Sequence, residues 1–274
     1  RPPAPPEGND DDSDAPEDLM DDDQMFEIDA LLTDAFKSAR QDRTQAKMHA
    51  SLLVNFKFRA CTLLDIYLKK VPASPHTVRM LLPLLRSLSA SLAPAPDGND
   101  QLAKRLTSLI TQGLCKAKMG ALTPSDADEA TIVLKRVSAL ASRSKTKPLV
   151  AASAAGALYL LRVIDACATA DAANQQAVVA PAGEVVTGML NDFFTRKDCR
   201  LPATFLEQAV QRCDWLPPLV LPAVLPLVQS ARSDFLRVAA ATLVATTLRH
   251  LATQQNGGGK EGGKKEKGKK EKGK

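Results

Sequence analysis

The sequence has few aromatic residues, one of the residue classes that β-strands favour. Aromatic residues make up only 4% of the 274 residues, and alanine and leucine supply most of the apolar side chains. Strands favour aromatic and β-branched residues, whereas alanine and leucine favour helices. The composition therefore predicts an all-α protein.

Cysteine is also scarce, and its spacing is wide. The five cysteines are odd in number, include no Cys-x-x-Cys pair, and have no histidine at the spacing of a metal ligand. Such cysteines are typical of small buried side chains in a reducing compartment. We therefore expect neither a disulfide framework nor a zinc site at Cys61, Cys115, Cys167, Cys199 and Cys213.

Long hydrophobic runs and a signal peptide are missing as well. No apolar run reaches about eighteen residues, the length at which a membrane-spanning helix becomes a candidate, and the start of the chain lacks the pattern of a secretory signal. Residues 149–164 come nearest, but the stretch is short and contains Arg162. We expect a soluble, intracellular protein, and Arg1 in place of methionine indicates a piece of a longer one.

Charge is distributed unevenly along the chain. Residues 1–23 hold ten acidic residues and one arginine, and the tail from Gly257 holds eight lysines and three glutamates. Both segments have almost no apolar residues, so we predict a disordered acidic linker at 1–23, a folded domain at 24–254 and a disordered Lys/Gly-rich tail at 255–274. The whole chain carries a net charge of +5, residues 1–23 carry −9 and the tail carries +5, so the part between them carries +9. This basic domain favours an anionic partner such as nucleic acid, although solubility alone would explain the same balance.

Apolar residues recur every three or four positions, which predicts amphipathic helices. One face in residues 24–40 carries Met25, Ile28, Leu32 and Phe36, and the polar residues 41–51 extend the next helix. A helical hairpin is predicted at 52–92, because Pro72 ends one helix and Ser74 with Pro75 begins another. The first helix of this hairpin is expected to bury Leu52, Phe56, Ala60, Leu63 and Tyr67.

Further helices are predicted at 100–118, from Thr123 and Pro124 onward, and at 148–168, 182–195, 202–213, 216–230 and 232–252. The helix at 148–168 is apolar on most sides, so we expect it to be central, and we expect Pro222 and Pro226 to bend the helix at 216–230. About ten helices joined by short loops favour an α-solenoid of helical hairpins, similar to HEAT or armadillo repeats. No internal repeat is exact, so a compact irregular bundle remains an alternative.

Several segments in order resemble a known family. They are QMFEIDALLTDAF at 24–36, the hairpin with LLPLL at 81–85, LYLLRV at 158–163, and residues 193–228. Over roughly residues 22–230 the chain resembles the C-terminal half of the Myb-binding protein 1A family, also called the DNA polymerase phi family. The resemblance implies a helical-repeat protein of the nucleus and nucleolus. It also implies roles in ribosomal RNA gene transcription, ribosome biogenesis and the binding of transcription factors.

The family's second name raises a polymerase as an alternative function. Polymerases hold two metal ions with paired carboxylates, and the nearest match is Asp126 with Asp128, which the helix dipole already explains. The tail motif GGKEGGK matches part of a phosphate-binding loop but lacks the flanking strand and helix. We therefore expect a protein that is not an enzyme and needs no cofactor. A helical-repeat transport adaptor is the third possibility.

Basic residues are the candidate binding sites. They cluster first in one segment, and such contacts to phosphates would give affinity with little sequence specificity. The alternative is that these are ordinary solvated helix faces. The cluster comprises Arg43, Lys47, Lys57, Arg59, Lys69 and Lys70, continues with Arg79, Arg86, Lys104, Arg105, Lys116 and Lys118, and is followed in the tail by Lys264, Lys265, Lys267, Lys269 and Lys270.

Overall fold

The computed structural model describes residues 22–71, 74–94, 99–119, 124–171 and 173–257, and every regular element in these ranges is helical. The predicted disordered linker and tail fall outside the described residues, apart from their helical edges at 22–23 and 255–257. The chain divides into two units, residues 1–56 and residues 57–274.

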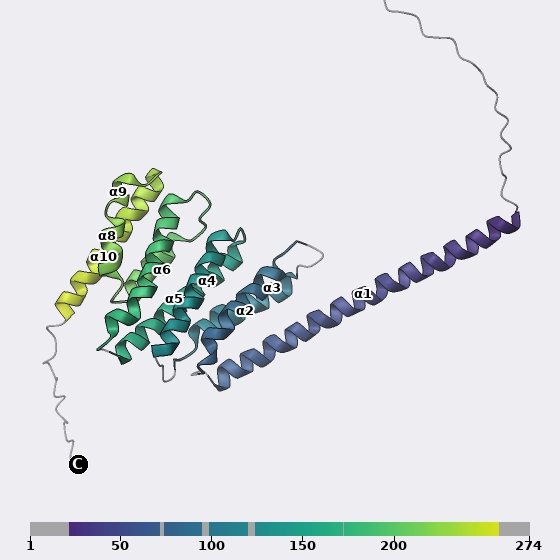
Figure 1. Ribbon diagram of the computed structural model, residues 1–274, viewed down its shortest axis with the longest axis horizontal. Coiled ribbons are helices and arrows are strands. Elements are labelled where there is room, and N and C mark those ends of the chain that lie inside the picture. Colours follow the sequence, from purple (N-terminus) through teal and green to yellow (C-terminus); the bar gives the residue numbers. More distant parts are fainter. Residues whose placement is uncertain (1–21, 72–73, 95–98, 120–123, 172, 258–274) are drawn as a thin grey trace, which may run out of the picture. The chain divides into compact units, whose positions relative to one another are not determined.

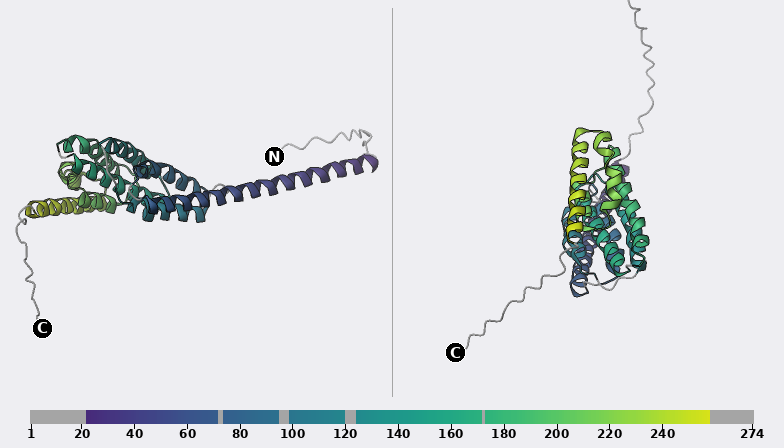
Figure 2. Two further views of the ribbon diagram at one scale, coloured as in Figure 1. Left: turned by 90° about the horizontal axis from the view of Figure 1, so that it is seen from below. Right: turned by 90° about the vertical axis from the view of Figure 1, so that its left-hand side faces the viewer.

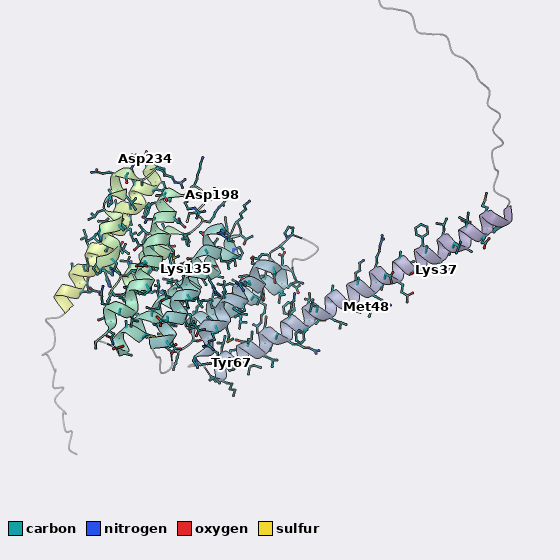
Figure 3. The ribbon with its side chains drawn as sticks, in the orientation of Figure 1. Lys37, Met48, Tyr67, Lys135, Asp198 and Asp234 are labelled. Atoms are coloured by element: carbon teal, nitrogen blue, oxygen red, sulfur yellow. The ribbon has the colours of Figure 1, made fainter. Side chains whose placement is uncertain are left out.

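Helix α1 (Asp22–Lys70) is a single helix of 49 residues that contributes to both units. The sequence predicted separate helices at 24–40 and 52–70, with 41–51 as an extension of the second. The two helices are one, because residues 41–51 contain neither proline nor glycine to end the first. In the first unit the predicted face of Met25, Leu32 and Phe36 is exposed, and Lys37 and Met48 project outward (Figure 3).

The last turns of α1 bury a different face from the one predicted. Leu63 is 67% exposed, whereas Cys61 and Leu68 on the other side of the helix are each only 4% exposed. Leu52 and Phe56, assigned to the same predicted face as Leu63, are exposed as well. The prediction was wrong because these turns carry aliphatic residues on two sides, so spacing alone does not identify the buried one.

The second unit is a row of helices, each much shorter than α1 (Figure 1). They are α2 (His76–Ser91), α3 (Asp100–Ser108), the π-turn η1 (Leu109–Gly113), the 3-10 turn η2 (Leu114–Lys116), α4 (Pro124–Arg143), α5 (Lys147–Ala170), α6 (Gln175–Thr195), α7 (Ala203–Arg212), α8 (Pro217–Val224), α9 (Leu227–Ser230) and α10 (Asp234–Gly257). Helices that pack together lie close in the sequence, such as α4 with α5 and α6, or α7 and α8 with α10. Such neighbour-to-neighbour packing confirms the helical-repeat solenoid.

Several predicted helix boundaries are also observed. The Ser74 hydroxyl accepts a hydrogen bond from the His76 amide at 3.2 Å as α2 begins. Asn99 caps α3 through its side chain, which accepts from the Leu102 amide at 2.8 Å. The helix predicted at 216–230 is divided into α8 and α9 at Leu225 and Pro226, whereas Pro222 lies inside α8.

Helix α5 is the centre of the core, as its apolar composition predicted. It packs against α2, α4, α6 and α7, and Leu160, Leu161 and Ile164 are fully buried. A β-carbon at Gly156 would lie 3.0 Å from the Leu81 side chain, so glycine lets α5 approach α2 closely. By length and composition α5 could cross a membrane, but 67% of its most apolar window is buried, which is typical of a core helix.

Candidate functional site

A groove lies between the end of α1 and the chain from α3 to Lys118. Its volume is about 490 Å³. We call it the α1–α3 groove, and it is lined by Asp65, Leu68, Lys69, Arg105, Ser108, Leu109, Gln112, Gly113, Lys116, Ala117 and Lys118. The π-turn η1 forms one wall, and a β-carbon at its Gly113 would lie 3.3 Å from Leu68. Glycine therefore allows this wall to approach α1, and π-turns inside helices often mark functional sites.

Asp65 is the one carboxylate in this lining, and it contacts two of the cations. Its Oδ2 accepts from Lys69 Nζ at 3.0 Å and from Arg105 Nη2 at 3.4 Å. The hydrogen bond from Lys69, together with the charges of Lys69 and Arg105, lowers the pKa of Asp65. Lys116 and Lys118 are exposed and have no carboxylate beside them in this groove, so the lining has an excess of positive charge.

A second groove, the α5–α7 groove, shares Lys116 with the first. It has a volume of about 510 Å³ and is lined by Thr111, Cys115, Lys116, Ala155, Leu158, Tyr159, Arg162, Gln208 and Arg212. Two further cations, Arg162 and Arg212, enter the site from α5 and α7. This lining contains no acidic residue.

Arg162 of α5 binds the chain segment at the end of η2, between the two grooves. Its Nη2 donates to the carbonyl oxygens of Cys115 at 3.1 Å and Ala117 at 3.0 Å, at the end of η2. Its guanidinium also lies 5.5 Å from the centroid of the Tyr159 ring, within the range of a cation–π contact. Arg162 therefore fixes the segment that carries Lys116 and Lys118 against α5.

The polar groups beneath the α5–α7 groove are not poised for nucleophilic chemistry. Burial raises the pKa of the Cys115 thiol to about 12, so this sulfur stays protonated at neutral pH. The Tyr159 hydroxyl is buried and lies 2.6 Å from Thr77 Oγ1, and burial raises its pKa too. Both side chains support the groove as neutral groups.

The α1–α3 and α5–α7 grooves together, hereafter the Lys116 grooves, present six cations and one carboxylate. The cations are Lys69, Arg105, Lys116, Lys118, Arg162 and Arg212. Because the grooves adjoin at Lys116, an extended anionic chain could contact cations from α1, α3, α5 and α7 in succession.

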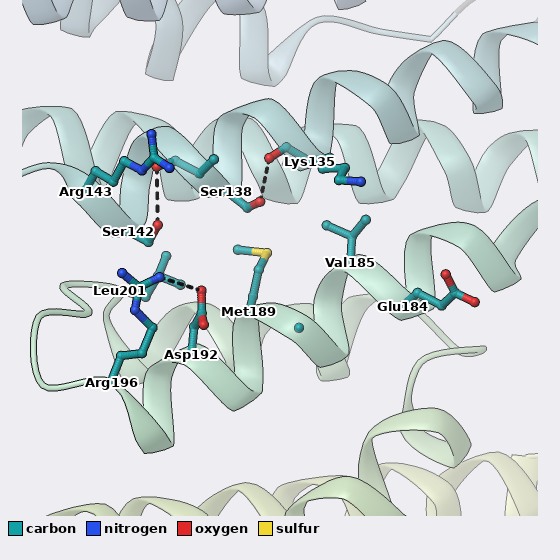
Figure 4. Close-up of a pocket in the computed structure, with 12 residues that line it drawn as sticks. Lys135, Ser138, Ser142, Arg143, Glu184, Val185, Met189, Asp192, Arg196 and Leu201 are labelled. Carbon is teal, nitrogen blue, oxygen red and sulfur yellow. Dashed lines mark hydrogen bonds and ion pairs between the residues drawn. The ribbon is translucent and has the colours of Figure 1, made fainter.

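A third groove, between α4 and α6, has a different charge (Figure 4). Its volume is about 460 Å³, and its lining holds Lys135, Arg143 and Arg196 together with Glu184 and Asp192. Arg196 Nη1 lies 3.3 Å from Asp192 Oδ2, so one cation is already paired within the lining. The α4–α6 groove is therefore close to electrically balanced.

The residues predicted from the sequence are placed in different surroundings. Lys69 lines the Lys116 grooves, as do Arg105, Lys116 and Lys118. Lys57 lines a separate pocket of about 230 Å³ beside Cys61 and Leu106. Arg79 is bound to Glu129, at 2.7 and 3.0 Å from its two carboxylate oxygens.

The remaining predicted cations are not gathered into the Lys116 grooves. Arg59 and Lys70 are exposed on α1 of the second unit, and Arg43 and Lys47 are exposed in the first unit. Lys264, Lys265, Lys267, Lys269 and Lys270 lie outside the described residues.

Arg162 and Arg212 were not predicted as site residues. Arg162 could have been singled out from the sequence, since it is the only charged residue in the apolar stretch between Lys147 and Asp165. Arg212 gave none, because only the packing of α7 brings it beside Lys116.

The acidic and histidine residues give no metal site in the part of the chain that the structure describes. No group of three His, Cys, Asp or Glu side chains there could hold a metal ion. Asp126 and Asp128 lie in the first turns of α4. His250 Nε2 lies 3.0 Å from Asp214 Oδ1, and His250 is far along the chain from His49 and His76.

Two known families match the sequence. The family described as DNA polymerase phi matches residues 4–68, and the family described as Myb-binding protein 1A-like, TPR repeats, matches residues 72–256. Neither the curated proteins nor the solved structures include a match to this chain. The second family covers well over half of the chain, and its repeat description agrees with the helical-repeat solenoid.

Proposed function

Since the chain belongs to the Myb-binding protein 1A-like family, we propose that it is a non-enzymatic interaction module of a nuclear protein. Helical repeats typically present extended surfaces to other proteins, and the family's TPR description supports such a role. We place the protein in the nucleolus, where it binds transcription factors or ribosome-biogenesis proteins and acts in ribosomal RNA gene transcription.

The Lys116 grooves are the proposed contact with nucleic acid. The observation that carries this proposal is their charge, six cations against one carboxylate in adjoining linings. Lysine and arginine contacts to phosphates give affinity that falls steeply with salt, because counterions are released on binding. Such contacts fix position without reading bases, so DNA and RNA of unrelated sequence should bind with similar affinity.

The lysine tail is the second proposed contact. It has eight lysines, three glutamates and no apolar residue, so it cannot present a fixed set of donors to base edges. Removing residues 257–274 should weaken binding to unrelated DNA and RNA sequences by similar factors and should lower nucleolar retention. The melting temperature of the folded part should stay the same.

An experiment that separates protein partners from nucleic-acid contacts tests the proposal. The chain is immobilised in nuclear extract with and without nuclease. Ribosome-biogenesis proteins or transcription factors that persist after nuclease support the interaction module. Loss of every bound protein after nuclease would leave only the nucleic-acid contact.

We also propose that the chain lacks polymerase activity. Asp126 and Asp128 lie near the start of α4, where acidic side chains complement the helix dipole. Nucleotide incorporation by Asp126→Ala and Asp128→Ala variants should equal that of the unchanged chain, at background level. Metal-dependent incorporation that either substitution abolishes would overturn the proposal and favour the polymerase alternative.

A further inference from the structure

Helix α10 carries two apolar faces, and only one is covered. Leu236, Ala240, Leu243 and Thr247 are buried on the inner face, where α10 packs on α7 and α8. On the outer face Phe235 is 73% exposed, Val238 65% and Leu248 49%.

The outer face is continuous, and its charged residues lie at its two ends, with Arg237 beside it. Phe235, Val238, Ala241, Ala245 and Leu248 follow one another at intervals of three or four residues, so they lie on one side of the helix. Thr242 belongs to the same side, and its hydroxyl donates to the Val238 carbonyl oxygen at 2.9 Å. That bond satisfies the Thr242 hydroxyl within the helix.

In the second unit α10 lies at the end of the row of helices (Figures 1 and 2), and its outer face is exposed. A continuous exposed apolar face is typical of an interaction surface.

The order of residues on this face is complementary to itself in reverse. When two copies of α10 are laid antiparallel, Phe235 of one faces Leu248 of the other, and Val238 faces Ala245. Ala241 then faces Thr242 at the centre, where small side chains allow the two helices to approach. Each large side chain thus meets a smaller or similar one, as an isologous two-fold interface requires.

Charges at the two ends of the face agree with the same alignment. Asp234, at the start of α10 (Figure 3), has a side chain that is 95% exposed and accepts from Arg237 Nη1 of the same helix at 3.0 Å, and Arg249 is exposed near the other end. In the antiparallel pair, Asp234 of one copy lies opposite Arg249 of the other, and the match occurs twice. A parallel pair would place each of these charges opposite its own kind.

We propose that the outer face of α10 binds α10 of a second copy of this chain in an antiparallel dimer. A single pair of helices buries less than the roughly 1,600 Å² of a standard interface, so the dimer should form reversibly as concentration rises. The chain's own segments at 1–21 and 258–274 are rich in Pro and Asp or in Lys and Gly. Neither offers the aliphatic stripe that would cover this face.

Sedimentation velocity of the chain over a concentration series tests the dimer. The unchanged chain should shift from monomer to dimer mass between micromolar and hundreds of micromolar. Val238→Glu or Ala245→Glu places a carboxylate on the face, and each should weaken dimerisation at least about tenfold. Ile132→Glu is the matched control, since Ile132 is 55% exposed on α4 and should leave the dimer unchanged.

A charge exchange tests the orientation. Asp234→Lys and Arg249→Glu should each weaken the dimer, and the two together should restore it, because the opposite pairing is re-formed. Deleting residues 258–274 should leave the dimer intact whatever that deletion does to nucleic-acid binding. A chain that stays monomeric throughout, glutamate variants that dimerise like the unchanged chain, or a double exchange that fails to restore the dimer would overturn the proposal.

Discussion

The Lys116 grooves and the α4–α6 groove have similar volumes and helical walls, and they differ in charge. The volumes are about 490 and 510 Å³ for the former and about 460 Å³ for the latter. Six cations face one carboxylate in the Lys116 grooves, whereas three cations face two carboxylates in the other. The shape of a solenoid groove therefore does not distinguish the two sites, and the placement of a few charged residues does.

The difference arises from which segments form the walls. In the α4–α6 groove, Glu184 and Asp192 come from α6, two turns apart on one helix, and they offset the cations of α4. In the Lys116 grooves the walls include η2 and the residues that follow it, which supply Lys116 and Lys118 without an acidic neighbour. Proteins or nucleic acids with negative charge should thus prefer the Lys116 grooves.

The largest effect on stability is expected in α5, which lines the α5–α7 groove and packs against both α4 and α6. Leu160→Asp would place a charge at a fully buried position that contacts the surrounding core. It should lower the free energy of unfolding by about 3 kcal/mol or more. Leu63→Asp should cost less than about 1 kcal/mol, because Leu63 is 67% exposed. Urea unfolding of both variants measures the difference, and equal losses would contradict the observed face of α1.

This pair of variants also shows how far sequence reasoning reached. The all-α class, the helix at 148–168 and its central position were predicted from composition and spacing, and the structure confirms them. The buried face of α1 was not, because Leu63 and Leu68 are both aliphatic and only packing against the neighbouring helices separates them. Spacing identifies a helix, but it cannot select between two apolar faces.

A smaller effect is expected at Arg162, which supports only the Lys116 grooves. Arg162→Ala removes two hydrogen bonds to the carbonyl oxygens of Cys115 and Ala117, and the cation–π interaction with Tyr159. The free energy of unfolding should fall by about 1–3 kcal/mol. Arg212→Ala, at an exposed cation of the same grooves, is the control and should change it by less than about 0.5 kcal/mol. Similar losses in thermal unfolding would show that Arg162 does not anchor η2.

The smallest effect on stability is expected at Asp65. Its pKa is lowered by the hydrogen bond from Lys69 and by the charges of Lys69 and Arg105, so its ionised form favours the folded state. This stabilisation is present above the ordinary carboxyl pKa of about 3.9 and is lost as pH falls through the lower folded value. Asp65→Asn should therefore reduce the acid-side loss of stability, measured by unfolding at a series of pH values.

The same substitution sharpens the comparison of the grooves. Asp65→Asn removes the one carboxylate of the Lys116 grooves and frees Lys69 and Arg105, so binding of a short single-stranded oligonucleotide should tighten a few-fold. Asp192→Asn in the α4–α6 groove is the matched control. If only Asp192→Asn tightened binding, the oligonucleotide would bind in the α4–α6 groove, and the proposed site in the Lys116 grooves would be contradicted.

The candidate site was only partly predictable from the sequence. Lys69, Arg105, Lys116 and Lys118 stood in a basic segment, and the structure gathers them into one lining. Arg212 lies almost a hundred residues after Lys116 and joins it through the packing of α7 on α5, which no local pattern reports. Arg43 and Lys47 belong to the same basic segment in the sequence, yet they lie in the first unit and outside these linings.

The central claim is that the Lys116 grooves bind phosphates, and a salt titration of nucleic-acid affinity tests it most directly. Affinity for one duplex is measured against salt for the unchanged chain, the double variant Lys116→Glu with Lys118→Glu, and the control Lys135→Glu with Arg143→Glu from the α4–α6 groove. Each phosphate that a variant no longer binds should flatten the slope of log affinity against log salt by about 0.9. We predict a slope flatter by about 2 for the Lys116 and Lys118 variant and an unchanged slope for the control. Equal slopes for all three proteins would contradict the account.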